Sequence, residues 1–162
     1  MIKILITGGA GFIGSHLTEK LMQNKKYNVF VVDNLLTGKK TNLKKNFRNF
    51  YKIDVNDYNQ ISNLFKKFNF DYVFHFAAVV GVKRTLEKPF LVLKDIEGFK
   101  NIFQLSFKYK VKRIFFSSSS EVYGEPVSIP QNEETTPLNS RLPYAIVKNV
   151  GESYCKIYFK EK

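Results

Sequence analysis

A glycine-rich turn near the N-terminus constrains this chain more than any other stretch. The apolar run at residues 2–6 indicates a buried parallel strand. Four glycines follow within residues 8–14, and a helical pattern of apolar side chains begins at Phe12. Glycines at this spacing permit a tight turn and let a pyrophosphate approach the backbone N–H groups at a helix N-terminus. The stretch therefore predicts a strand, a dinucleotide-binding turn and a helix.

An acidic residue ends the second apolar run of the chain. Val29–Val32 reads as another buried strand, and Asp33 follows it directly. Asp33 comes ~20 residues after the glycine turn, where a carboxylate accepts both hydroxyls of an adenosine ribose. The same carboxylate would repel a ribose 2′-phosphate. We therefore expect NAD rather than NADP as the cofactor, although Lys39 and Lys40 lie close by in the sequence.

Strand and helix patterns alternate along the whole chain. Such alternation is typical of an α/β protein with a parallel sheet covered by helices on both faces. We expect a Rossmann-type, doubly wound sheet in the order 3-2-1-4-5, with ligands bound beyond the carboxyl ends of the strands. Asp57 is expected to cap the second helix, and Pro89 to lie near the start of the third. The expected strands are 2–6, 28–32, 49–53, 71–76 and 111–117, and the expected helices are 12–24, 57–68, 90–109 and 143–160.

Two polar clusters in the second half of the chain suggest proton chemistry. The strand at 111–117 runs into four consecutive serines at 117–120. Further on, Tyr144 and Lys148 have the i, i+4 spacing that places them on one helix face. A phenol is a poor base at neutral pH, but a nearby ammonium and a bound nicotinium would favour the phenolate. Tyrosine, lysine and serine together could move a proton from an alcohol while hydride passes to a nicotinamide.

Composition narrows the classes of partner. The formal net charge is +12, but the lysines are scattered and form no stripe, so we expect no nucleic-acid partner. The apolar runs are far shorter than the ~20 residues of a membrane span, so no membrane partner is expected. No signal peptide is expected before the first strand. Cys155 is the only cysteine, which suits a reducing cytoplasm, and no cluster has the spacing of metal ligands.

The motifs in this order resemble one family. TGGAGFIGSHL at 7–17, HFAA at 75–78, SSSSEVYG at 117–124 and YAIVK at 144–148 are similar to the N-terminal part of the extended short-chain dehydrogenase/reductases. The resemblance is to the NAD-dependent nucleotide-sugar epimerases and dehydratases. It implies cofactor contacts from four groups of residues. These are Gly8, Gly11, Phe12, Ile13 and Gly14 for the pyrophosphate, Asp33 and Asn34 for the adenosine ribose, and Asp54 and Val55 for the adenine, with Ala77 and Ala78 on the nicotinamide side.

The same resemblance assigns catalytic roles. The catalytic hydroxyl of the family stands four residues before the tyrosine of the V-Y-G motif, which selects Ser119. Tyr144 would be the base, and Lys148 would support it while bonding the nicotinamide ribose. Ser119 would also contact the nucleotide-sugar substrate. The family commonly pairs its third and last helices across a dimer, so a homodimer is expected of the full-length form.

The chain departs from the family in two ways. Asp95 stands where the family usually has asparagine, a change that affects a contact on the cofactor side. In addition, family members are roughly twice as long, with further strands and a small substrate domain (domains of ~100–200 residues). We therefore interpret residues 1–162 as an incomplete NAD-binding Rossmann domain, truncated before the last strands and the substrate domain.

The subgroup stays open at this stage. Lys83 lies in a stretch similar to that of uronic-acid nucleotide-sugar 4-epimerases, where it could pair with a substrate carboxylate or phosphate. Glu121 resembles an additional acid–base residue of UDP-glucuronate decarboxylases and dehydratases. The leading hypothesis is 4-epimerisation of a UDP-sugar or UDP-uronic acid. The alternatives are a UDP-glucuronate decarboxylase or dTDP-glucose dehydratase type of enzyme, and a non-catalytic NAD-binding fragment.

Overall fold

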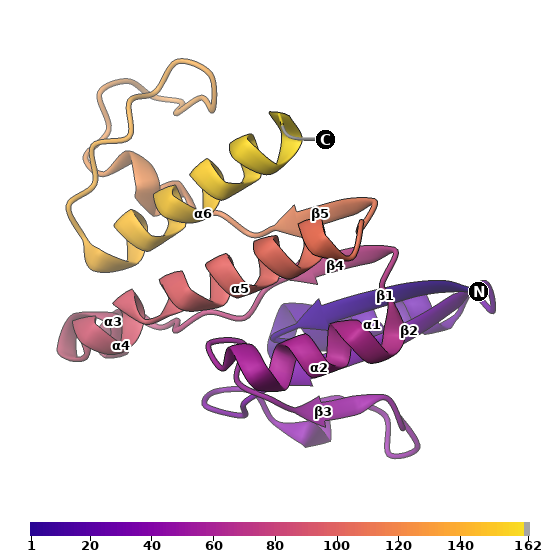
Figure 1. Cartoon of the computed structure of the whole chain (residues 1–162). Helices are drawn as coiled ribbons and strands as arrows, with labels where there is room; N and C mark the ends of the chain where they lie inside the picture. The colour runs from indigo at the N-terminus through magenta and orange to yellow at the C-terminus, as the bar shows by residue number, and fades with distance from the viewer. Residues whose placement is uncertain (161–162) are drawn as a thin grey trace.

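The computed structural model describes residues 1–160, which form a five-stranded parallel sheet with helices on both faces (Figure 1). The strand order is β3-β2-β1-β4-β5, as the sequence predicts. The first strand therefore lies in the middle, and the chain reverses direction across the sheet between β3 and β4. The strands are β1 (Ile2–Thr7), β2 (Tyr27–Asp33), β3 (Phe50–Lys52), β4 (Tyr72–His75) and β5 (Arg113–Phe116).

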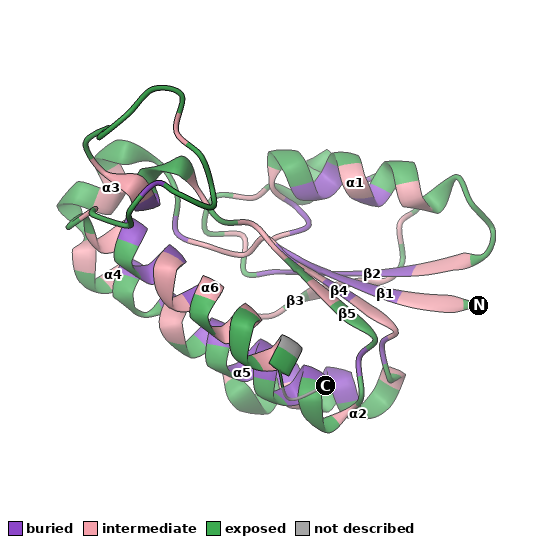
Figure 2. Ribbon diagram, turned by 90° about the horizontal axis from the view of Figure 1, so that it is seen from above, coloured by how far each residue is buried: buried purple, intermediate pink, exposed green. Residues whose placement is uncertain are grey.

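The helices divide between the two faces of the sheet. α1 covers one face, and α2, α5 and α6 cover the other, as Figure 2 shows. The short helices α3 and α4 lie beyond the carboxyl ends of the strands (Figure 1). The helices are α1 (Phe12–Met22), α2 (Tyr58–Phe68), α3 (Val82–Glu87), α4 (Pro89–Leu93), α5 (Asp95–Lys108) and α6 (Pro143–Lys160), with 3₁₀ turns η1 (Lys40–Asn42) and η2 (Ser120–Tyr123).

Alternate side chains of the central strands form a core on each face. Leu5 and Phe30 pack with Phe65 of α2 and Ile102 of α5. Ile6 and its neighbours on the opposite face pack against α1. Both faces of β1 are therefore buried, which explains why this strand reads as an unbroken apolar run. Burial of each such side chain stabilises the fold by about 1.5–3 kcal/mol.

The predicted caps are confirmed. The Asp57 side chain accepts a hydrogen bond from Gln60 N at 3.1 Å, which satisfies one of the free N–H groups at the start of α2. Pro89 occupies the first turn of α4, where a missing N–H costs nothing. The segment between β2 and β3 is a loop with one short helical turn, η1.

The prediction of one helix at 90–109 was wrong. The structure has α4 and α5 there, with Lys94 between them, and it adds α3 before them. Lys94 keeps helical dihedral angles, but Glu97 N bonds Lys94 O, three residues back, in place of the regular i−4 bond. Lys88 separates α3 from α4 with φ −130° and ψ 59°, because a residue before proline is disfavoured in the helical region.

Within residues 1–160, no helix combines the length and the apolar character that crossing a membrane requires.

Candidate functional site

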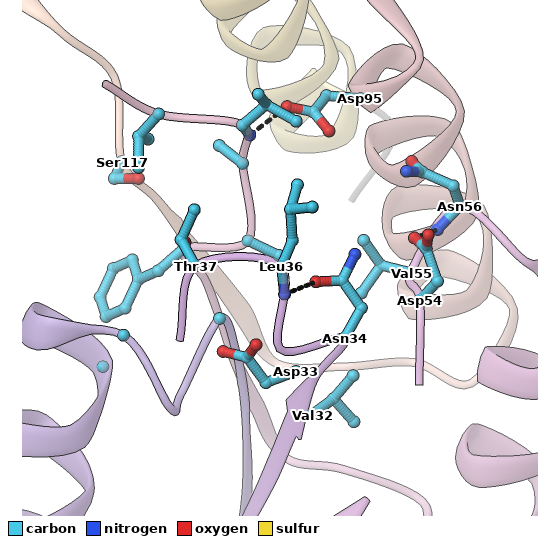
Figure 3. Close-up of a pocket in the computed structure, with 18 of the residues that line it drawn as sticks. Val32, Asp33, Asn34, Leu36, Thr37, Asp54, Val55, Asn56, Asp95 and Ser117 are labelled. Atoms are coloured by element: carbon cyan, nitrogen blue, oxygen red, sulfur yellow. Dashed lines mark hydrogen bonds between the residues drawn. The ribbon is translucent and has the colours of Figure 1, made fainter. Parts of the chain in front are cut away.

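A cleft of about 330 Å³ lies beyond the carboxyl ends of the strands, where the chain reverses across the sheet. The loops after all five strands contribute to its walls, together with α1, α4, α5 and α6. Figure 3 shows the part of this cleft around Asp33, Asp54 and Asp95. Every residue that the sequence analysis assigned to the cofactor lines this cleft: Gly8, Gly11, Phe12, Ile13, Gly14, Asp33, Asn34, Asp54, Val55, Ala77, Ala78, Tyr144 and Lys148.

The glycine turn is too tight for side chains. Gly8 has φ +67°, and a Cβ there would lie 2.7 Å from Ala77 N. No side chain caps the N-terminus of α1, so the first N–H groups of this helix stay available to a ligand. Phe12 and Ile13 are 80% and 65% exposed although both are apolar. An uncapped helix start beside a close-packed glycine turn fits a pyrophosphate.

Asp33 lies at the carboxyl end of β2 and is held in place by the backbone. Its Oδ2 accepts from Ala10 N at 3.0 Å, and its Oδ1 accepts from Leu35 N at 2.8 Å. Only 7% of the residue is exposed, and it still reaches the cleft. A Cβ on Gly38 would lie 2.9 Å from both carboxylate oxygens, so the loop after β2 closes over this group. A fixed carboxylate at this place suits a ribose diol.

The loop after β3 forms the adjoining wall. The Asp54 carboxylate accepts from Asn56 N at 3.0 Å, and Asn101 of α5 donates to Val55 O at 2.9 Å. These bonds fix the backbone of the loop against α5. Gly98 makes the close approach possible, because a Cβ there would lie 2.8 Å from Asn56 Oδ1. The loop after β3 is therefore a fixed wall of the cleft.

The loop after β4 is held in place by hydrogen bonds to β1 and to α5. Ala77 N donates to Thr7 Oγ1 at 3.3 Å, and the same hydroxyl pairs with His75 Nδ1 at 2.7 Å. Val79 N donates to Asp95 Oδ2 at 2.6 Å. His75 is fully buried, and burial lowers its pKa to about 3, so it is a neutral core residue.

Tyr144 and Lys148 lie on α6 at the opposite side of the cleft. Lys148 is 3% exposed, and its Nζ donates to Ser117 O at 2.8 Å. The same Nζ lies 5.6 Å from the centre of the Tyr144 ring and 5.0 Å from that of Phe116. Burial lowers the pKa of Lys148 to about 8, partly offset by the charge of Asp95. The predicted pair is therefore assembled, with an ammonium that gives up its proton more easily than a free lysine.

Ser119 and Glu121 lie close to Tyr144, as the motif predicts. Burial raises the pKa of Tyr144, the interaction with the Ser119 side chain lowers it, and the charge of Glu121 raises it. Ser119 Oγ also accepts from Glu121 N at 3.2 Å, which orients the hydroxyl at the start of η2. Neither residue lines the cofactor cleft itself.

Lys83 is not brought to this site. It lies on α3, its side chain is 87% exposed, and its Nζ stands 3.9 Å from Glu87 one turn away. It is absent from the cleft lining, so its role toward the substrate stays a prediction. In residues 1–160, no group of three or more His, Cys, Asp or Glu side chains is arranged to hold a metal ion.

Sequence reasoning missed several residues of the cleft. Asn56 follows Asp54 and Val55 at the same strand end, so its position was a usable signal. The others come from loops and short helices without a distinctive pattern, and no sequence signal pointed to them. They include Leu36, Thr37, Leu91 and Lys94, whereas Ser117 and Ser118 belong to the serine run that the sequence analysis singled out without assigning it to the cofactor.

The geometry agrees with the comparison to known proteins. The profile of the NAD dependent epimerase/dehydratase family matches residues 4–162. The chain belongs to this family. Its resemblance to the extended short-chain dehydrogenase/reductases is confirmed, and so is the Rossmann-type fold.

Relatives in the family include several kinds of nucleotide-sugar enzyme. A putative UDP-glucose 4-epimerase of Methanocaldococcus jannaschii is 42% identical over 96% of this chain and 50% of its own length. A UDP-N-acetyl-alpha-D-glucosaminuronate decarboxylase of Bacillus cytotoxicus is 39% identical over 96% of this chain and 50% of its own. The chain thus spans about half the length of the curated relatives it matches.

Solved structures agree with this assignment. The UDP-glucose 4-epimerase of Thermotoga maritima, solved with UDP-glucose, superposes with a TM-score of 0.92 at 39% identity. That match covers 99% of this chain and 52% of the epimerase. The UDP-glucose 4-epimerase of Thermus thermophilus, solved in complex with NAD, gives a TM-score of 0.89 at 35% identity, over 99% of this chain and 51% of the other.

Proposed function

We propose that the chain is the cofactor-binding half of an NAD-dependent 4-epimerase acting on a UDP-sugar or UDP-uronic acid. The observation that carries this proposal is the single cleft that joins the uncapped glycine turn at one end to Tyr144 and Lys148 at the other. The curated relatives that this chain matches over about half of their own length include UDP-glucose 4-epimerases, which supports the proposal.

Different residues of the chain would bind different parts of the cofactor. The N–H groups at the start of α1 would take the pyrophosphate, the Asp33 carboxylate the adenosine ribose, and the wall around Val55 the adenine. Ala77 and Ala78 are small enough to let a nicotinamide ring lie against the loop after β4. NAD, when bound, supplies an acceptor for the hydride of the sugar carbon and later returns it to the opposite face.

Tyr144 would remove the proton from the sugar hydroxyl. Its phenolate is favoured by the Lys148 ammonium, which is fixed by Ser117 O and sits against the tyrosine ring. Ser119 would hold the same substrate oxygen as it changes from hydroxyl to carbonyl. We assign the binding site for the nucleotide part of the substrate to the part of the full-length relatives that this chain does not match.

Glu121 favours a second candidate function. Its carboxylate lies close enough to Tyr144 to raise the pKa of the phenol. A second acid–base group beside the tyrosine suits decarboxylation or dehydration after the first oxidation. Decarboxylases occur among the relatives, including UDP-glucuronic acid decarboxylase 1 of Danio rerio at 35% identity. A non-catalytic NAD-binding fragment is the third candidate, from another class.

We further propose a cytoplasmic homodimer for the full-length form. The single cysteine is compatible with a reducing compartment. Apolar side chains on the outer faces of the last two long helices support a partner there, since Phe107 and Ile157 are 53% and 58% exposed.

Cofactor choice gives the first test, by titrating NAD and NADP and following the quenching of tyrosine fluorescence. We expect NAD to bind at least about tenfold more tightly, because Asp33 would repel a 2′-phosphate. In Asp33→Asn the preference should shrink through weaker NAD binding. Asp57→Asn, on the exposed start of α2, is the matched control and should leave both affinities unchanged. Equal or tighter binding of NADP by the unaltered chain would overturn the choice of NAD.

Turnover gives the second test. The chain is incubated with NAD and UDP-glucose or UDP-glucuronate, and the products are resolved by chromatography. A C4 epimer supports epimerisation, and a pentose product with release of CO₂ supports the decarboxylase. NAD binding without any product supports the non-catalytic fragment for this chain.

A further inference from the structure

Asp95 is a buried acid at the floor of the cleft that the proposed chemistry leaves without a role. It begins α5, lines the cleft and is only 7% exposed. The family usually has asparagine at this position, as noted above. Figure 3 shows its carboxylate at the cleft wall, bonded to the loop after β4. A buried carboxylate in place of an amide adds a negative charge where the fold does not require one.

The hydrogen bond of Asp95 does not depend on that charge. Its Oδ2 accepts from Val79 N at 2.6 Å, and an asparagine carbonyl could accept from the same N–H. The structural task of anchoring the loop is therefore one that an amide performs equally well. What only the acid provides is its charge.

The charge of Asp95 acts chiefly on α6. It raises the pKa of Lys148, against the effect of burial, and it also raises the pKa of Tyr144. In return, the Lys148 ammonium lowers the pKa of Asp95, which burial raises to about 6. Lys148 has its other polar contact with a neutral carbonyl, Ser117 O. Asp95 is thus the carboxylate that acts on the ammonium from across the cleft floor.

The remaining groups around Asp95 do not replace it. Asp54, after β3, bears the same sign and raises the pKa of Asp95, while the Asn56 side chain lowers it by hydrogen bonding. His75, at the end of β4, packs against Phe99 of α5 and is neutral. Lys94 adjoins Asp95 in the chain and also lines the cleft.

We propose that Asp95 is a positioning residue: a buried carboxylate that lines the same cleft as the buried Lys148 and supplies the counter-charge of its ammonium. With the carboxylate present, Lys148 and Tyr144 hold their protons to higher pH. Asparagine at this position would let both groups lose their protons at lower pH. The catalytic consequence rests on the proposed function, but the coupling between the two side chains does not.

The test is Asp95→Asn in the whole chain, with the Lys148 side chain followed by NMR on protein labelled with ¹³C-lysine. The Cε signal of Lys148 is assigned from its loss in Lys148→Arg. We expect the midpoint of its titration to fall by about one pH unit in Asp95→Asn, a tenfold change in ionisation constant. The matched control is Glu97→Gln, because Glu97 lies in the same turn but pairs with Lys100 in solvent. It should leave the midpoint unchanged.

A reciprocal measurement guards against misfolding of the first variant. By linkage, Lys148→Met must raise the titration midpoint of the Asp95 carboxyl, followed by its ¹³Cγ signal. An unchanged Lys148 midpoint in Asp95→Asn, or an equal shift in Glu97→Gln, would overturn the inference.

The kinetic consequence is measured separately. If turnover is found, the pH profile of kcat/KM should move as a whole to lower pH in Asp95→Asn, and a lower rate with an unmoved profile would show a merely structural role. Coupling seen by NMR in a chain that does not bind NAD would refute the proposed function and leave this inference standing.

Discussion

Tyr144 is the residue on which the proposed chemistry depends most directly. Without a ligand, burial is the largest influence on its side chain, and it raises the pKa of the phenol. The interaction with Ser119 acts in the opposite direction. The phenolate therefore needs the positive charge of a bound nicotinium in addition to Lys148 before it can serve as a base near neutral pH. This makes proton removal dependent on the cofactor.

Tyr144→Phe separates binding from chemistry, because it removes the hydroxyl and keeps the ring beside Lys148. We expect turnover to fall by about 10²–10⁴-fold, the usual contribution of a positioned general base. NAD affinity should change little. Initial rates of sugar interconversion and a parallel NAD titration measure the two effects. Tyr123→Phe, in the same cluster of loops, serves as the control, and a Tyr144→Phe variant with full activity would remove Tyr144 from the mechanism.

Individual site residues were predictable where their type and spacing are demanded by chemistry. Glycine at 8 and 14, the acid at 33 and the pair at 144 and 148 all line one cleft, as predicted. Residues such as Leu91 and Lys94 reach the cleft only because α4 folds across it. Nothing in their side chains distinguishes them from exposed residues of any short helix.

At the scale of elements, α6 sits against β5 with almost no room between them. A Cβ on Gly151 would lie 2.8 Å from Phe116 Cε1 and closer still to Cζ. The Phe116 ring cannot move aside freely, because it packs against His75 and Phe99 and carries the Lys148 ammonium on its face. Glycine at 151, whose side chain is a single hydrogen atom, thus fixes the distance between α6 and the sheet.

Gly151→Ala is expected to destabilise the protein although alanine is the better helix former. Overpacking costs about 1–3 kcal/mol, which outweighs a gain of up to about 1 kcal/mol in helix propensity. Urea unfolding followed by circular dichroism measures the change in free energy. Ser153→Ala, exposed on the same helix, should be neutral or slightly stabilising. A Gly151→Ala variant more stable than the parent would show that α6 can shift outward freely.

The order of strands was predictable from the sequence, and the helices near 80–95 were not. Apolar runs and the glycine turn fix where β1 and β2 lie, and helices on both faces follow from alternation. The short helix α3 contributes no apolar face to the core, since its apolar residues Val82 and Leu86 are exposed. The end of α3 depends on Lys88, which precedes Pro89 and is therefore disfavoured in the helical region. This local effect ends a helix without changing the spacing of apolar residues in the sequence.

At the scale of the whole molecule, two buried groups have opposite effects on acid stability. His75 has a pKa of about 3 in the folded chain against 6.5 in its ordinary state, so unfolding takes up a proton between these values. The folded state therefore loses stability as the pH falls below about 6.5. Asp95 has a pKa of about 6 against 3.8, so the folded chain takes up a proton first and gains stability as the pH falls from about 6 toward 4.

The two effects should nearly cancel between pH 4 and 6, each being worth ~1.4 kcal/mol per pH unit. Asp95→Asn should expose the loss due to His75, so that its free energy of unfolding falls more steeply below pH 6 than that of the parent. His75→Asn should show the reverse slope, while its amide can still pair with Thr7. Denaturant unfolding at several pH values measures both slopes. Identical slopes in the parent and the two variants would contradict the assigned ionisation states.

The central place of β1 has a consequence for synthesis on the ribosome. Residues 2–7 pair with residues 27–32 on one side, and residues 4–7 pair with residues 72–75 on the other. The first pairing closes a short loop and can form early, whereas the second must wait for a much longer segment to be translated. Until then, one edge of the first strand has no neighbour. The first strand thus leaves the ribosome well before β4 and is enclosed late on that side, which exposes its edge to pairing with other chains in the meantime.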